Sequence, residues 1–185
     1  MFDVERFIAD CRTANGEDPA GQAVREVVER AVSEPAGVLS ALGEPTQGGV
    51  TKLFHSDELT VLNIVWTPHM TLMPHNHEMW AVIGIYTGRE DNIFWKRLPE
   101  RDDGRIKAAG VKELCEKNVA QLGPDIIHSV TNPVRRLTGA IHVYGGDFFG
   151  ADRSEWDPES LLELPYDVEK NMALFEEGNA RLAEY

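Results

Sequence analysis

The chain has 185 residues, of which 42% are apolar and 26% are charged, and its formal net charge is −13. This length and composition are typical of one soluble globular domain with a core large enough to shape a pocket. The excess of acidic side chains would repel phosphate groups, so we expect no nucleic acid and no anionic membrane as partner. Two distant cysteines, Cys11 and Cys115, exclude a disulfide framework and a zinc knuckle.

The N-terminal segment carries acidic residues and no apolar run of the kind found in a signal peptide, which favours a cytoplasmic location. Residues 59–77 contain no Asp, Glu, Lys or Arg and approach the length of a membrane span. The segment also contains prolines, histidines and asparagines, which would leave polar groups and a broken helix in lipid. We therefore predict two buried strands joined by a turn.

Helical spacing of apolar residues marks the first part of the chain. Phe2, Val4, Phe7, Ile8 and Cys11 fall near this spacing, and a second amphipathic pattern follows between residues 24 and 32. We predict two N-terminal helices and a third helical turn at 35–42, followed by glycine and proline punctuation.

The pattern then changes to short β-rich segments separated by turn residues and without helical interludes, which favours a sandwich or closed barrel. The predicted strands are 50–55, 59–66, 79–87, 92–97, 105–110, 112–119, 126–131 and 137–144. Residues 167–185 resemble a C-terminal helix. We predict a single domain, 1–185, with a helical segment at 1–49, a β-barrel core at 50–150 and a C-terminal extension and helix at 151–185.

The placement of the six histidines is the most informative chemical pattern. His75 and His77 are two residues apart, so on one strand, opened by Pro74 and continued from Trp80, both imidazoles would project from the same face. Two neutral imidazoles can chelate a divalent metal, but this spacing alone is weak evidence. His128, in the segment Gly-Pro-Asp-Ile-Ile-His-Ser-Val, is placed to supply a third ligand from another strand.

Together, the segments around His75, His77 and His128 resemble the two metal-binding motifs of the cupin superfamily. The resemblance covers about residues 50–144 and implies a mainly β fold, the double-stranded β-helix or jelly-roll barrel. The carboxylate that many cupins carry four or five residues after the second histidine is absent, because Ala81 and Val82 occupy those positions.

Within the cupins, a site of three histidines resembles that of the thiol dioxygenases, the family of cysteine and 3-mercaptopropionate dioxygenases. The resemblance implies Fe(II) as cofactor and the oxidation of a small thiol by O2 to its sulfinate. It also implies that His142 and Tyr144 act beside the iron, where the family has a Ser-His-Tyr row; Ala140 replaces the serine here. Arg153 falls at the position where the mercaptopropionate branch places its carboxylate-binding arginine.

Two further residues are candidates for contact with the substrate. We expect Trp80 in the pocket wall and His55 at the pocket mouth. The partners are then a small thiol and O2, and the protein is a monomer or a homodimer. Two alternatives stay open: another metal-dependent cupin enzyme, such as a carbon-skeleton dioxygenase or an isomerase, and a non-catalytic metal-binding sensor.

Overall fold

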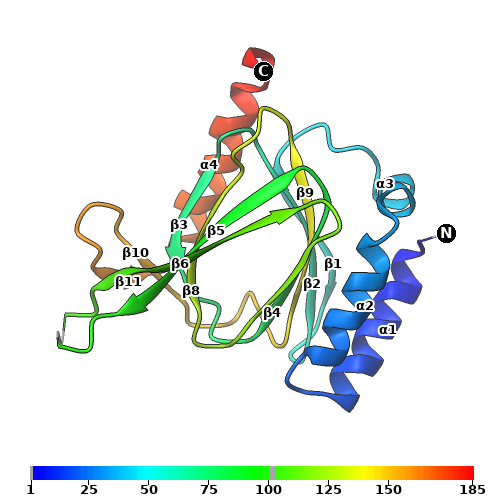
Figure 1. Ribbon diagram of the computed structural model, residues 1–185, viewed down its shortest axis with the longest axis horizontal. Helices are drawn as coiled ribbons and strands as arrows, with labels where there is room; N and C mark the ends of the chain where they lie inside the picture. The colour runs from blue at the N-terminus through cyan, green and yellow to red at the C-terminus, as the bar shows by residue number, and fades with distance from the viewer. Residues whose placement is uncertain (1, 101–102) are drawn as a thin grey trace.

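The computed structural model describes residues 2–100 and 103–185 (Figure 1). Three helices come first, as the sequence predicts: α1 (Val4–Glu17), α2 (Gln22–Val32) and α3 (Pro35–Leu42). Local chemistry sets their starts. The Asp3 carboxylate accepts a hydrogen bond from the Arg6 amide at 2.8 Å and caps α1, while Gly21 takes a left-handed conformation (φ 84°) before α2. Pro35 occupies the first turn of α3, where its missing N–H costs nothing.

Two antiparallel sheets make up the rest of the fold. The first has the order β1-β2-β9-β4-β7 and the second the order β11-β10-β3-β8-β5-β6. Strands far apart in sequence are neighbours, as where β9 lies between β2 and β4. Two antiparallel sheets built in this order form a double-stranded β-helix flanked by helices, so the predicted mainly β fold class is confirmed. The strands are β1 (Gly49–His55), β2 (Thr60–Trp66), β3 (Thr71–His75), β4 (Ala81–Thr87), β5 (Arg89–Arg97), β6 (Ile106–Cys115), β7 (Val119–Leu122), β8 (Ile127–Thr131), β9 (Thr138–Tyr144), β10 (Ser154–Trp156) and β11 (Glu163–Pro165).

Several predicted strand boundaries are wrong. The histidine pair does not lie on one strand, because β3 ends at His75 and β4 begins only at Ala81. Glu78 takes a left-handed conformation (φ 58°) between them, which an extended strand does not permit. The predicted strands 105–110 and 112–119 are instead β6, a turn and β7. The short strands β10 and β11 were not predicted.

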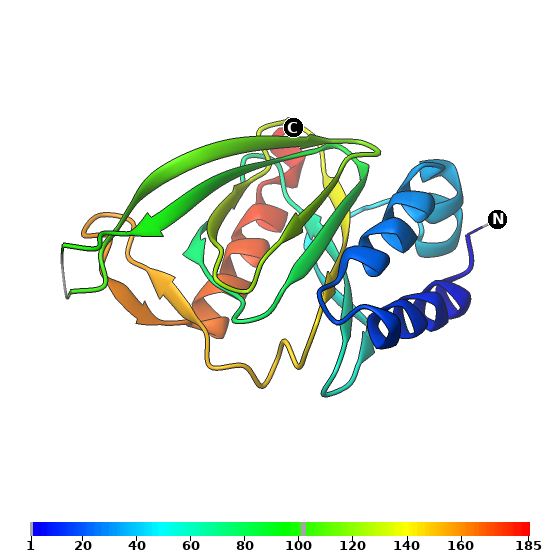
Figure 2. The same ribbon diagram turned by 60° about the horizontal axis from the view of Figure 1, so that its bottom comes forward.

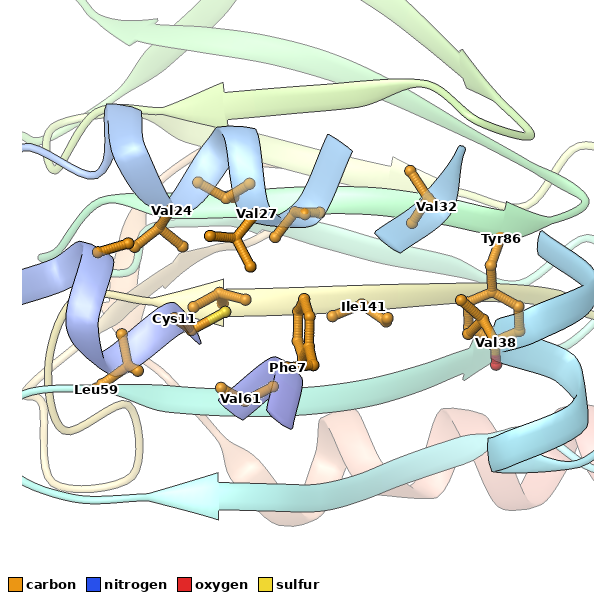
Figure 3. Packing of buried hydrophobic residues seen from close by; sticks show 14 of the residues in the cluster. Phe7, Cys11, Val24, Val27, Val32, Val38, Leu59, Val61, Tyr86 and Ile141 are labelled. Atoms are coloured by element: carbon orange, nitrogen blue, oxygen red, sulfur yellow. The ribbon is translucent and has the colours of Figure 1, made fainter. Parts of the chain in front are cut away.

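The N-terminal helices pack on the outer face of the first sheet (Figures 1 and 3). Val61, Val143 and Val82 form a row across three paired strands on this face. Their neighbours on β2 and β4, Leu62 and Ile83, belong to a second cluster inside the barrel. This alternation follows from the two-residue period of a strand and buries both faces of the sheet. Both cysteines are free thiols.

The predicted C-terminal helix is confirmed as α4 (Val168–Ala180), which is followed by a short 3-10 turn at Leu182–Glu184. It lies across the barrel, away from α1 and α2 (Figures 1 and 2). Phe175 stacks on Trp66 of β2 with 5.5 Å between ring centroids, so α4 closes part of the barrel interior. None of the helices in the described residues is long and apolar enough to cross a membrane.

Candidate metal centre

Three buried histidines converge inside the barrel. His75 ends β3, His77 lies in the loop after it and His128 lies on β8. One ring nitrogen from each lies within 4.8 Å of the others, and the Nε2 atoms of His77 and His128 are 3.3 Å apart. The pairing of His75 with His128 across β3 and β8 brings the two sequence motifs together. These three residues could hold a metal ion.

The hydrogen bonds of Nδ1 in His75 and in His128 fit a role of these histidines as metal ligands. Nδ1 of His75 lies 2.9 Å from the carbonyl oxygen of Met73, and Nδ1 of His128 lies 2.7 Å from Oδ1 of Asn92. A carbonyl oxygen only accepts, so each Nδ1 carries the proton and each Nε2 keeps a lone pair. This is the usual arrangement of a metal-binding histidine and its supporting acceptor.

Burial also favours the neutral, metal-binding form of the three rings. It lowers the pKa of His75 to about 4, partly offset by the hydrogen bond to Met73. Burial and the neighbouring histidines hold the pKa of His77 and of His128 well below the usual value. Glu78, the nearest carboxylate in the sequence, is exposed and accepts a hydrogen bond from the Asn76 amide, so it is not in the group. Three neutral ligands would leave the charge of a divalent ion uncompensated.

His142 and Tyr144 lie beside the triad. Nδ1 of His142 is 3.1 Å from the Tyr144 hydroxyl, and the Tyr144 ring centroid is 5.0 Å from that of His77. Burial raises the pKa of Tyr144 far above its usual value, so the phenol keeps its proton. The structure therefore brings these two predicted residues to the site.

A buried carboxylate next to this group was missed from the sequence. Glu90 on β5 is fully buried and accepts hydrogen bonds from Trp66 Nε1 at 2.8 Å and Asn92 Nδ2 at 3.0 Å. Its Oε2 also lies 3.6 Å from Nε2 of His142, slightly too far for a hydrogen bond. Glu90 and Asn92 are two residues apart on one strand face, and that spacing is the signal from which they could have been found.

A cavity of about 110 Å³ adjoins the three histidines. That volume suits a compound of a few heavy atoms rather than the larger ligands that fill ordinary binding pockets. Its walls come from the barrel strands, the 145–153 loop and α4, and they are mostly apolar. The residues include His75, His77, His128, His142, Tyr144, Phe148, Arg153, Tyr166, Asn171 and Phe175.

Arg153 is the cation of this cavity. It is 7% exposed, and its guanidinium carbon lies 4.0 Å from the Phe148 ring centroid and 4.3 Å from that of Tyr166. Its Nε and Nη1 atoms are buried without a hydrogen-bond partner among the described residues. Strand pairing holds the position, since the Arg153 carbonyl accepts from the Tyr166 amide at 3.0 Å. Two buried N–H groups of a cation without an acceptor are costly, which points to an anionic ligand as their partner.

Two predicted substrate contacts are not brought to the cavity. Trp80 packs among the N-terminal helices on the outer face of the first sheet, and its Nε1 donates to the Pro19 carbonyl at 2.8 Å. The prediction for Trp80 is wrong, because alternation along β4 and its approach turns the indole away from the barrel interior. His55 lies at the exposed end of β1, where its Nε2 is 2.7 Å from Oδ1 of Asp147. Its ring contacts the ring of Phe149, which lines the cavity, so Phe149 separates His55 from the cavity.

No family model matches the chain. Similar solved structures include an RmlC-like cupin family protein with a double-stranded β-helix fold from Methanocaldococcus jannaschii, at 12% identity and a TM-score of 0.46, covering 57% of this chain and 86% of that chain. The DMSP lyase DddQ from Ruegeria pomeroyi matches at 13% identity and a TM-score of 0.47, over 62% of this chain and 54% of the lyase. Oxalate decarboxylase from Bacillus subtilis matches at 15% identity and a TM-score of 0.41, over 51% of this chain and 22% of the decarboxylase. The likeness concerns the fold of the barrel, and the chemistry of this chain has to be argued from its own residues.

Proposed function

We propose that the protein is a non-haem Fe(II) thiol dioxygenase that oxidises a small carboxylate-bearing thiol, such as 3-mercaptopropionate, to its sulfinate. The observation that carries the proposal is the pair of buried Arg153 nitrogens without a hydrogen-bond partner among the described residues, Nε and Nη1, in the same small cavity as three neutral histidines. One ligand that satisfies both has a carboxylate at one end and an anionic soft donor at the other. A short thiol acid has this form.

The histidine set supports the choice of a thiol. Because His75, His77 and His128 contribute no negative charge, a divalent ion bound to them favours an anionic ligand. When bound, Fe(II) would supply a Lewis-acidic centre with open positions for the thiol and for O2. The reaction balances without another reductant: both atoms of O2 end on the sulfur, which gives up the four electrons that O2 takes.

The residues of the protein itself would bind and orient the substrate and donate a hydrogen bond to the reacting oxygen. Arg153 would bind the substrate carboxylate, and cation–π contacts with the rings of Phe148 and Tyr166 hold its guanidinium at the cavity. Apolar walls exclude water from the reacting sulfur. Tyr144, protonated and positioned by His142, would donate a hydrogen bond to the oxygen as charge develops on it. Ala140 offers no hydroxyl to His142, so a different group must orient that ring here.

Metal analysis followed by oxygen uptake tests the proposal. Protein purified without added iron is assayed for metals, loaded anaerobically with Fe(II), and mixed with 3-mercaptopropionate, cysteine or cysteamine in an oxygen electrode. We expect uptake with 3-mercaptopropionate and a product heavier by two oxygen atoms. Iron-loaded protein that consumes no O2 with any of the three thiols would contradict the dioxygenase assignment and favour another cupin enzyme or a sensor.

The ligand assignment is tested separately with His128→Ala. We expect this variant to lose stoichiometric iron, because one of three ligands is removed. His69→Asn is the matched control, since His69 is exposed on a turn with a positive φ of 58° that asparagine accepts. A His128→Ala protein that keeps one iron per chain would overturn the triad.

A further inference from the structure

The buried carboxylate of Glu90 has a place in the fold that the proposed reaction does not use. It lies behind the cavity wall, on β5, and reaches the candidate metal centre only through Asn92. One of its hydrogen bonds serves the buried Trp66 indole, and the other leads through Asn92 to His128.

Hydrogen bonds link Glu90 to Asn92 and Asn92 to His128, and the direction of each bond follows from the chemistry of the groups. The indole nitrogen of Trp66 and the amide nitrogen of Asn92 can only donate, so the carboxyl oxygens of Glu90 accept from both. The amide nitrogen of Asn92 is thereby turned to Glu90, and its oxygen is turned to His128. That oxygen also only accepts, so Nδ1 of His128, at 2.7 Å, must carry the proton. Nε2 then keeps its lone pair on the side of His75 and His77.

We infer that Glu90 is a positioning residue that sets the tautomer of His128 through the orientation of the Asn92 amide. The carboxylate fixes which end of the amide faces the histidine, and the amide fixes which imidazole nitrogen is free to bind metal. Without an acceptor at position 90 the amide has no reason to keep this orientation, and the reversed amide would present N–H groups to Nδ1. His128 would then carry its proton on Nε2, the atom needed for the metal. The inference rests on metal binding by the triad and not on thiol oxidation.

The same carboxylate faces His142. Oε2 of Glu90 lies 3.6 Å from Nε2 of His142, whose other nitrogen is 3.1 Å from the Tyr144 hydroxyl. Ala140 leaves no hydroxyl in the row to orient His142, and Glu90 approaches that ring from β5 instead. One buried group thus lies beside His142 and reaches His128 through Asn92.

The test measures tautomers directly. In metal-free protein labelled with 15N-histidine, two-bond 1H–15N correlation spectra distinguish a proton on Nδ1 from one on Nε2. We expect His128 to be the Nδ1–H form in the wild type. A wild-type His128 with its proton on Nε2 overturns the inference without any variant.

Two variants test the order of hydrogen-bond donors and acceptors along Glu90, Asn92 and His128. Glu90→Gln keeps the shape but places an N–H group toward either Asn92 or Trp66, so we expect His128 to lose the pure Nδ1–H form. The double variant Glu90→Gln/Asn92→Asp restores the order of donors and acceptors: the new amide donates to position 92, and the new carboxylate accepts from His128. We expect the double variant to recover the wild-type tautomer.

Metal affinity provides the second readout, with Co(II) as the probe and its visible absorption as the signal. We expect Glu90→Gln to weaken Co(II) binding by about 10- to 100-fold, as is usual when a residue that supports a metal ligand by hydrogen bonding is replaced. The double variant should bind Co(II) nearly as tightly as the wild type. Glu113→Gln, an exposed carboxylate on β6, is the matched control. If Glu90→Gln keeps both the tautomer and the affinity, or if the double variant folds but does not recover them, Glu90 does not set the tautomer. If Glu90→Gln does not fold, the wild-type spectrum and the double variant decide the question.

Discussion

The guanidinium carbon of Arg153 lies 4.0 Å from the ring centroid of Phe148, and it also lies 4.3 Å from the ring centroid of Tyr166. The rings hold the cation by cation–π contacts, while Nε and Nη1 have no hydrogen-bond partner among the described residues. The arrangement leaves these two nitrogens for a ligand.

Replacing Arg153 by glutamine should therefore affect thiols according to their charge. We expect kcat/KM for 3-mercaptopropionate to fall about 30- to 100-fold, which corresponds to the roughly 2–3 kcal/mol of a hydrogen bond to a charged group. Cysteamine, which has no carboxylate, should not lose rate. Steady-state oxygen uptake measures both, with the exposed Arg136→Gln as control. An equal loss for the two thiols would show that Arg153 does not bind the carboxylate.

Removing the Tyr144 hydroxyl should slow the reaction without releasing metal. The phenol is buried, its pKa is raised, and it touches His142 but is not in the histidine triad. We expect Tyr144→Phe to lower kcat by about 100-fold with Co(II) affinity unchanged. The matched control is Tyr86→Phe, which removes another buried hydroxyl, 2.8 Å from Asn63 Oδ1, and should leave turnover intact. A Tyr144→Phe enzyme with wild-type kcat would exclude the phenol from the chemistry.

The metal-free protein should lose stability as the pH falls from about 7 to about 4. Burial lowers the pKa of His75 to about 4 and holds the pKa values of His77 and His128 well below the ordinary value, whereas an unfolded histidine has a pKa near 6.5. In this window the unfolded chain binds more protons than the folded chain, so acid favours unfolding. The expected slope is about 1.4 kcal/mol per pH unit for each histidine.

Urea unfolding in the presence of EDTA, repeated across this pH range, measures that slope. His128→Gln removes one of the three titrating groups and should reduce it, whereas His69→Asn should leave it unchanged. An identical slope in His128→Gln and in the wild type would contradict the buried, neutral state assigned to His128.

Helix α2 packs so closely on β4 that one added methyl group between them should destabilise the fold. A Cβ on Gly84 would lie 2.5 Å from Cγ1 of Val28 and 3.0 Å from Cγ1 of Val32. We expect Gly84→Ala to lower the free energy of unfolding by about 1–3 kcal/mol, because the helix must move off the sheet. Gly110→Ala on β6, with open space around the new methyl, should change it by less than about 0.5 kcal/mol. An unchanged free energy of unfolding in Gly84→Ala would show that α2 can move off the sheet at little cost, which contradicts the prediction.

The sequence by itself determined the parts of this protein that depend on local periodicity and residue chemistry. Helical spacing placed α1 and α2, alternating β-rich segments placed most barrel strands, and the histidine pattern named His75, His77 and His128. These signals are local, since a strand's two-residue period and an imidazole's ligand chemistry need no knowledge of partners.

What only the tertiary structure decided is which residues meet. Glu90 and Asn92 are polar residues of an ordinary strand until β5 pairs with β8 and sets Asn92 beside His128. Trp80 follows the histidine pair closely in sequence, yet the turn at Glu78 sends it to the opposite face of the sheet. Arg153 becomes a cavity residue because β10 pairs with β3, far away in sequence. Long-range strand pairing fixes the contacts of Asn92 and Arg153, and no short stretch of the chain contains both partners of such a pair.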